Sequence, residues 1–362
     1  MSRFLIVCGG TGGHLAPGIA VAEGLLKRGH ECRLVISRKE VDSRLIADYP
    51  HLTYLRAPGR GYGGGVLGIA ASGWDLCRGI FFALTLFKKE KPDRILAFGG
   101  FLSLGMVIVA QLYAIPVALH EANNRPGRVI RWVRKMADRV YMPPRVRIHG
   151  VAMERVRHFG YPVREGIQLL AQADARLRLG IEVDRRLLVV VGGSQGAEAL
   201  NEWVDQNFNK LAQQGISVYC VTGTSKERPP LRTAPSQEGH SVHCYSVGFT
   251  GDMGTLLSAA DVVISRAGAG AIAELIRCRA PGILIPYPFA SDDHQLANAR
   301  GHEQLGAALV IEQKNLKDLL HEVESLIFND WLLNRFKDNL QAMDERDATG
   351  AIVADLEKIT ND

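Results

Sequence analysis

The chain has 362 residues, more than one typical domain contains, so two compact domains are expected. Its composition, with 47% apolar and 22% charged residues, excludes disordered, collagen-like and disulfide-dense proteins. The net charge of +5 is unevenly divided, because residues 1–163 carry +13 and residues 164–362 carry −8. The basic half predicts contact with an anionic partner such as phosphate, nucleic acid or membrane lipid.

The chain begins with MSRFLIVCGG, which starts a strand pattern and lacks the features of a secretory signal. Its six cysteines form no CxxC pair and no zinc-binding spacing, so a reduced, cytoplasmic protein is expected. Residues 95–119 are uncharged over a length that could cross a bilayer. Gly99, Gly100 and Pro116 divide this run, which predicts a strand, a turn, a helix and a second strand of a buried α/β unit.

The same order of elements is predicted twice. A strand at 3–8 leads into the loop GGTGGH, a helix with Pro17 in its first turn and Gly29 at its C-terminal cap, and a strand at 31–37. A strand at 187–191 leads into GGSQG, a helix and the strand ISVYCVT. We therefore expect two Rossmann-like, doubly wound α/β domains that bind ligands at the carboxyl ends of their strands, with a cleft between them.

The expected domain boundaries follow from a linker at 160–166. The first domain covers 1–163 and the second covers 164–339, and a C-terminal helix at about 340–362 is expected to pack back on the first domain.

The two glycine loops match neither the GxGxxG pattern of dinucleotide-binding folds nor a P-loop. One glycine pair is explained by a tight turn alone. Two such loops in matched positions favour anion binding, because a helix N-terminus offers free N–H groups to a diphosphate.

Seven segments in order resemble the MurG family, the bacterial transferases that convert lipid I to lipid II in peptidoglycan synthesis. They are 9–14 (GGTGGH), 98–103 (FGGFLS), 120–123 (HEAN), 160–164 (GYPVR), 192–197 (GGSQGA), 266–274 (RAGAGAIAE) and 293–299 (DHQLANA).

The resemblance implies a GT-B fold, with a lipid-linked acceptor on the first domain and UDP-GlcNAc bound mainly by the second. It implies donor contacts from Thr11, Gly12, Gly13, Asn123, Arg164, Ser194, Thr250, Ala269, Gly270, Ala271, Ile272, Ala273, Glu274 and Gln295.

Three of these residues have a clear physical role and also a simpler alternative. The carboxylate of Glu274 can accept hydrogen bonds from both ribose hydroxyls, or it is a solvated first-turn glutamate. Ser194 suits a diphosphate or an ordinary N-cap. Arg164 offsets charge on the leaving diphosphate or is a surface arginine.

Asn123 and Gln295 can both donate to and accept from sugar hydroxyls, although such loop residues usually cap turns. His14 is the candidate general base because imidazole titrates near neutrality, and its alternative role is donation to a backbone carbonyl. Glu121 is the reserve candidate. The expected reaction is a displacement with inversion that requires no metal and no cofactor.

Two segments predict contact with an anionic membrane. Residues 66–91 are apolar and contain Trp74 and Phe81, and they end with three lysines; residues 125–139 carry six arginines and lysines beside Trp132. The alternative is that the apolar side chains belong to the domain core. No nucleic-acid-binding motif accompanies the charge, so nucleic acid is not an expected partner.

The chain departs from the family pattern at four places. Leu104 and Gly105 replace Gly-Pro, Tyr161 replaces asparagine in GNPVR, HEAN replaces HEQN, and Ala271 replaces a polar residue near the ribose motif. Three rival functions remain open: a sugar-nucleotide epimerase, a transferase with another lipid acceptor such as diacylglycerol, and a non-catalytic UDP-sugar-binding scaffold.

Overall fold

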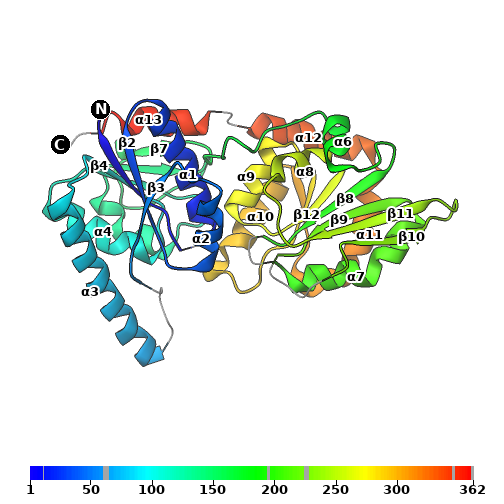
Figure 1. Cartoon of the computed structure of the whole chain (residues 1–362), viewed down its shortest axis with the longest axis horizontal. Coiled ribbons are helices and arrows are strands. Elements are labelled where there is room, and N and C mark those ends of the chain that lie inside the picture. Colours follow the sequence, from blue (N-terminus) through cyan, green and yellow to red (C-terminus); the bar gives the residue numbers. More distant parts are fainter. Residues whose placement is uncertain (11, 60–64, 194–195, 224–227, 345–346, 360–362) are drawn as a thin grey trace. The chain divides into compact units, whose positions relative to one another are not determined.

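The computed structural model describes residues 1–10, 12–59, 65–193, 196–223, 228–344 and 347–359 (Figure 1). The chain forms two compact units. The first comprises Met1–Arg164 and Glu345–Asp362, and the second comprises Glu165–Asp344. Each is an α/β unit with a seven-stranded sheet, as the paired strand-loop-helix patterns predict.

The sheet of the first unit is parallel throughout, with the order β3-β2-β1-β4-β5-β6-β7. Its central strands are continuous apolar runs because helices cover both of their faces. The strands are β1 (Arg3–Val7), β2 (Glu31–Ile36), β3 (Thr53–Arg56), β4 (Arg94–Ala97), β5 (Val117–His120), β6 (Arg139–Met142) and β7 (Val156–His158).

Two helical layers cover this sheet. On one face, Leu15 and Ile19 of α1 (Gly12–Lys27) and Ile352 of α13 (Ala348–Leu356) join the same buried cluster. α2 (Glu40–Ala47) lies on this side also, through Ile46. The opposite face packs against α3 (Gly65–Lys89), α4 (Gly100–Leu112) and α5 (Arg128–Val133), followed by η1 (Arg134–Met136) and η2 (Met153–Arg155).

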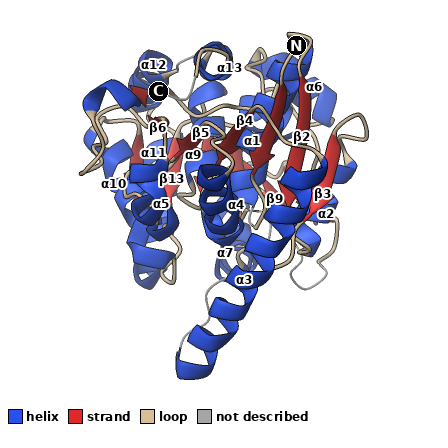
Figure 2. Cartoon of the chain, turned by 90° about the vertical axis from the view of Figure 1, so that its left-hand side faces the viewer, coloured by secondary structure: helices blue, strands red, loops and turns tan. Residues whose placement is uncertain are grey.

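The uncharged run at 95–119 forms β4, α4 and β5, which confirms the predicted buried α/β unit. Helix α4 is apolar because it lies between the sheet and α3. The N-terminal half of α3 extends beyond the sheet (Figure 2). Within the described ranges, no helix combines the length and apolar character needed to cross a bilayer.

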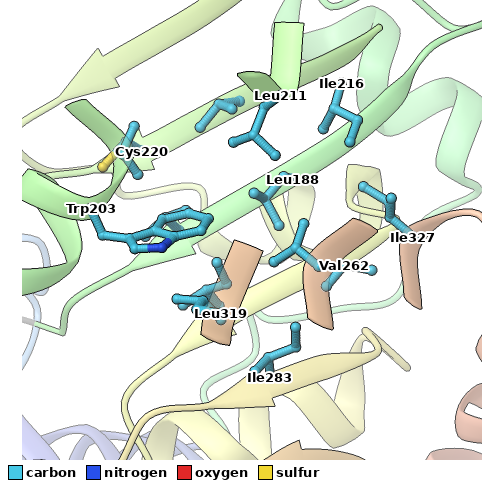
Figure 3. Close-up of a cluster of buried hydrophobic side chains, with 14 of the residues drawn as sticks. Leu188, Trp203, Leu211, Ile216, Cys220, Val262, Ile283, Leu319 and Ile327 are labelled. Atoms are coloured by element: carbon cyan, nitrogen blue, oxygen red, sulfur yellow. The ribbon is translucent and has the colours of Figure 1, made fainter. Parts of the chain in front are cut away.

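The second unit has the strand order β10-β11-β9-β8-β12-β13-β14, parallel except for the β10–β11 hairpin. Leu188 and Val190 of β8 enter the large cluster shown in Figure 3, together with Trp203 and Leu319. The alternate residues of β8 are buried on the opposite face of the sheet, because successive side chains of a strand point to opposite faces. The strands are β8 (Arg186–Val191), β9 (Ile216–Val221), β10 (Leu231–Pro235), β11 (Ser241–Val247), β12 (Val262–Ser265), β13 (Gly282–Leu284) and β14 (Ala308–Val310).

The helices of the second unit form the layers on the two faces of this sheet. They are α6 (Gln172–Leu179), α7 (Glu198–Gln213), α8 (Met253–Ala259), α9 (Ala269–Arg277), η3 (Ser291–Asp293), α10 (His294–Gln304), η4 (Gln313–Asp318), α11 (Leu319–Ile327) and α12 (Asp330–Met343).

One local prediction was wrong. Helix α1 begins at Gly12, within the glycine loop, so Pro17 lies inside the helix and not in its first turn. A C-terminal helix does pack on the first unit, as expected, but it is shorter than the range 340–362. Helix α12 ends at Met343 and α13 starts at Ala348, where the Asp347 carboxylate accepts from the Gly350 amide at 3.0 Å.

Candidate active site

The carboxyl ends of the central strands bring the sequence motifs of the first unit together. The GGTGGH loop follows β1, FGGFLS follows β4, and HEAN begins within β5, which adjoins β4. The order of the strands changes direction between β1 and β4, because β2 and β3 lie on one side of β1 and the later strands lie on the other. Open α/β sheets bind ligands at such a switch point.

The glycine loop is fastened to the end of β2. A Cβ atom added to Gly9 would lie 2.2 Å from the Ser37 nitrogen, so only glycine fits this close approach. The fully buried Asp42 carboxylate accepts from the Gly10 amide at 2.8 Å and from the Ser37 hydroxyl at 2.6 Å. The Lys39 ammonium donates to the Gly10 carbonyl at 2.9 Å. Our sequence analysis missed Asp42, whose only signal is an acidic residue in the helical turn after β2.

His14 lies in the first turn of α1, directly after Gly12 and Gly13, while Thr11 is outside the described residues. A Cβ atom at Gly100, the first residue of α4, would lie 3.3 Å from His14 Nδ1. The glycine therefore leaves room for the imidazole beside the start of α4. This position at the ligand-binding edge suits a general base.

A row of rings continues along the same edge. The centroids of Phe98 and His120 are 4.9 Å apart, and those of His120 and Tyr161 are 6.3 Å apart with nearly perpendicular planes. Burial, with a smaller contribution from His14, lowers the pKa of His120 to about 3. His120 is therefore neutral at physiological pH, so its ring supplies no positive charge to a ligand at this edge.

Glu121, the reserve base, organises the loop that follows β5. Its carboxylate accepts from the Gly127 amide at 2.6 Å, and from the amide and side-chain nitrogens of Asn123 at 2.8 and 2.9 Å. Burial raises the pKa of the Glu121 carboxyl, and these hydrogen bonds oppose the shift. A carboxylate engaged by three donors is poorly placed to take another proton, which favours His14 over Glu121 as the base.

Arg164 ends the N-terminal segment of the first unit and is partly buried. Its guanidinium donates to the Tyr49 hydroxyl at 3.5 Å. It therefore has a packing partner inside its own unit, and its predicted contact with a diphosphate stays a prediction.

The second glycine loop lies at the matching place after β8. A Cβ atom at Gly192 would lie 2.4 Å from the Ala197 nitrogen, so the loop closes tightly before α7. The Gly196 amide donates to the Gly193 carbonyl at 2.9 Å and closes the turn. Ser194 is outside the described residues. A helix start at a strand's carboxyl end is a suitable diphosphate site.

The predicted ribose motif forms the start of α9. Ala269, Gly270 and Ala271 are partly exposed, whereas the side chains of Ile272 and Ala273 are buried and leave only backbone groups for a ligand.

Glu274, the remaining residue of this motif, is partly exposed and lies in the second turn of α9. The alternative of a first-turn glutamate stabilised by the helix dipole is therefore wrong.

Side chains that our sequence analysis did not single out fix the neighbouring loops. Arg266 donates to the Ile285 carbonyl at 3.2 Å and to Gln313 Oε1 at 2.7 Å. Asn298 is buried and donates to the Ala267 carbonyl at 3.2 Å. Both residues lie within quoted motifs, but their tertiary partners are invisible in the sequence.

Two predicted polar contacts are also engaged locally. Gln295 Oε1 accepts from the Tyr287 amide at 2.9 Å, and Thr250 Oγ1 accepts from the Asp252 amide at 3.2 Å just before α8. Both residues lie in or next to loops at the carboxyl edge of the second sheet, and their donor contacts stay predictions.

Comparison with known proteins agrees with this geometry. Residues 4–142 match the glycosyltransferase family 28 N-terminal domain, and residues 187–351 match the C-terminal domain of the same family. The chain is 48% identical to a protein of Opitutus terrae over 99% of this chain and 96% of the relative. It is 34% identical to one of Nitratidesulfovibrio vulgaris over 98% and 97%.

Both relatives are named UDP-N-acetylglucosamine--N-acetylmuramyl-(pentapeptide) pyrophosphoryl-undecaprenol N-acetylglucosamine transferase. Among solved structures, Acinetobacter baumannii MurG superimposes with a TM-score of 0.76 at 23% identity, covering 99% of this chain and all of that one. That likeness shows a common two-domain glycosyltransferase fold. Together, the family domains and the full-length relatives establish that the chain belongs to the MurG family of N-acetylglucosaminyltransferases.

Proposed function

We propose that the chain transfers GlcNAc from UDP-GlcNAc to the 4-hydroxyl of MurNAc in undecaprenyl-pyrophosphoryl-MurNAc-pentapeptide, which converts lipid I to lipid II. The observation that carries this proposal is family membership over 99% of the chain, with both glycine loops at the carboxyl edges of their sheets. The enzyme is accordingly a hexosyltransferase.

The second unit binds the donor in this proposal. The diphosphate lies at the 192–196 loop, where backbone amides and the start of α7 favour an anion. The ribose hydroxyls donate to Glu274, because α9 presents this partly exposed carboxylate beside its N-terminal turn. Thr250 and Gln295 add polar contacts from neighbouring loops.

The first unit activates the acceptor. His14 takes the proton of the 4-hydroxyl while its oxygen bonds to the anomeric carbon of GlcNAc. The bond from that carbon to the diphosphate breaks, and UDP leaves with the electron pair. Attack opposite the leaving group inverts the anomeric centre. Gly12, Gly13, Asn123 and Arg164 contact the donor from this unit, as does Thr11, which lies outside the described residues.

The first unit also meets the membrane in this proposal. The exposed fractions of Trp74, Phe81 and Trp132 are 68%, 72% and 59%, and exposed lysines end α3. Aromatic side chains beside cations are typical of surfaces that rest on anionic lipid. Phe87, near the end of α3, lies instead in the domain core and is 2% exposed. We place the enzyme peripherally on the cytoplasmic face of the bacterial cell membrane, where other cell-wall synthesis proteins are further candidate partners.

A transfer assay tests the proposal, with radiolabelled UDP-GlcNAc, a lipid I analogue and a diacylglycerol as a rival acceptor. The expected result is label in the lipid I analogue alone, linked with inverted anomeric configuration. Label in diacylglycerol, an isomerised sugar nucleotide formed without acceptor, or UDP-GlcNAc binding without turnover would each contradict it.

A further inference from the structure

Pro17 changes the hydrogen bonding in the first turn of α1, which contains His14. In an α-helix, the carbonyl of residue i accepts from the amide four residues later. Helix α1 begins at Gly12, so the Gly13 carbonyl would accept from residue 17. Residue 17 is proline and has no N–H. The helix backbone therefore leaves this acceptor, next to His14, without its usual donor.

Tyr161 supplies a donor from outside the helix. Its hydroxyl donates to the Gly13 carbonyl at 3.2 Å. The ring is placed by contact with His120, which in turn packs on Phe98.

The hydrogen bond from the Tyr161 hydroxyl holds the peptide unit that joins Gly13 to His14. A peptide unit is planar, so fixing the Gly13 carbonyl also fixes the direction of the His14 amide and the path of the chain into His14. We propose that Tyr161 is a positioning residue for the transfer reaction: it replaces the helical hydrogen bond that Pro17 removes and so orients His14. This inference rests on the proposed role of His14 as the base.

A double-mutant cycle between Tyr161 and Pro17 tests the inference. Tyr161→Phe removes only the hydroxyl, and we expect kcat to fall about 5- to 30-fold with an unchanged KM for UDP-GlcNAc. Pro17→Ala restores a backbone N–H that can donate to the Gly13 carbonyl. In that background, Tyr161→Phe should lower kcat less than about 2-fold. Tyr54→Phe, in exposed β3, is the matched hydroxyl deletion and should leave kcat unchanged.

Three outcomes would overturn the inference: an equal loss in both backgrounds, no loss in Tyr161→Phe, or a loss confined to the KM for UDP-GlcNAc. The carbonyl-carbon NMR chemical shift of Gly13 gives a readout that does not depend on turnover. A change in this shift is expected in Tyr161→Phe, because the Gly13 carbonyl loses the hydrogen bond from the hydroxyl. An unchanged shift contradicts the inference even if Pro17→Ala fails to fold. Absence of transfer by the wild type would instead refute the proposed function.

Discussion

The two sheets share a winding order but present different chemistry at their carboxyl edges. In the first unit, β3-β2-β1-β4-β5-β6 corresponds to β11-β9-β8-β12-β13-β14 in the second, and each has a glycine loop after its central strand. The first edge brings together His14, His120 and Glu121, whereas the second offers helix starts, amides and Glu274. The fold thus places a ligand, and the loop side chains decide what is done to it.

Two shifted pKa values lie at the first edge. Burial lowers the pKa of His120 to about 3 and raises that of Glu121, while the hydrogen bonds that Glu121 accepts oppose its shift. His14 stays the proposed base because the Glu121 carboxylate is already engaged by the Gly127 and Asn123 donors. This division of labour is testable from the largest effect to the smallest.

The largest effect is expected for His14→Ala. Removing a general base should lower kcat about 10²- to 10⁴-fold while leaving the affinity for UDP unchanged. Transfer kinetics with the lipid I analogue and calorimetric titration of UDP measure the two quantities. His240→Ala, an exposed histidine at the β10–β11 turn, is the control. Full activity of His14→Ala would assign the base elsewhere.

Glu274→Ala should weaken donor binding, in contrast to His14→Ala, which should lower kcat. Loss of a carboxylate that accepts from the ribose should raise the KM for UDP-GlcNAc about 10- to 100-fold, because hydrogen bonds to charged groups are strong. Steady-state kinetics at varied donor concentration measure this effect. Glu238→Ala, whose side chain is 84% exposed, is the control. An unchanged donor KM would refute the ribose assignment.

Membrane contact should depend on the first unit alone. We expect the double variant Trp74→Ser, Phe81→Ser to bind anionic vesicles roughly tenfold more weakly, because two exposed aromatics no longer enter the interface. Vesicle sedimentation measures this binding. Leu112→Ser removes a side chain as exposed as Phe81, at 72%, from the end of α4 and serves as control. An equal loss of vesicle binding in the Leu112→Ser control would contradict a specific role of α3 in membrane contact.

A separate prediction concerns stability in acid. The pKa of His120 is about 3 in the folded chain and about 6.5 in a solvated imidazole, so the unfolded chain binds the proton first as pH falls. Stability should therefore decline between pH 6.5 and 3 by at most about 1.4 kcal/mol per pH unit from this group. His120→Phe should reduce the slope of the urea midpoint against pH. An unchanged slope would contradict the assigned burial effect.

Much of the architecture was predictable because it depends on local patterns. The apolar runs that became β1 and β8, and the glycine loops after them, predicted two doubly wound units, which the structure confirms. Gly99, Gly100 and Pro116 also separated β4, α4 and β5 within a run that was long enough for a membrane span.

The rest depends on partners that are distant in the sequence. Asp42 contacts Gly10 only because α2 packs against the end of β2, and Tyr161 contacts Gly13 across 148 residues. The position of Pro17 was misjudged because helix α1 starts within the glycine loop. A single sequence contains no signal for such pairings.

Amide hydrogen exchange of the intact chain with and without UDP tests the division between the two edges most directly. We expect the largest slowing at the start of α9 and in the described residues of the second glycine loop, with little change at Gly9 and Gly10. Slowing concentrated at Gly9 and Gly10, with the start of α9 unaffected, would contradict the assignment of the nucleotide to the second unit.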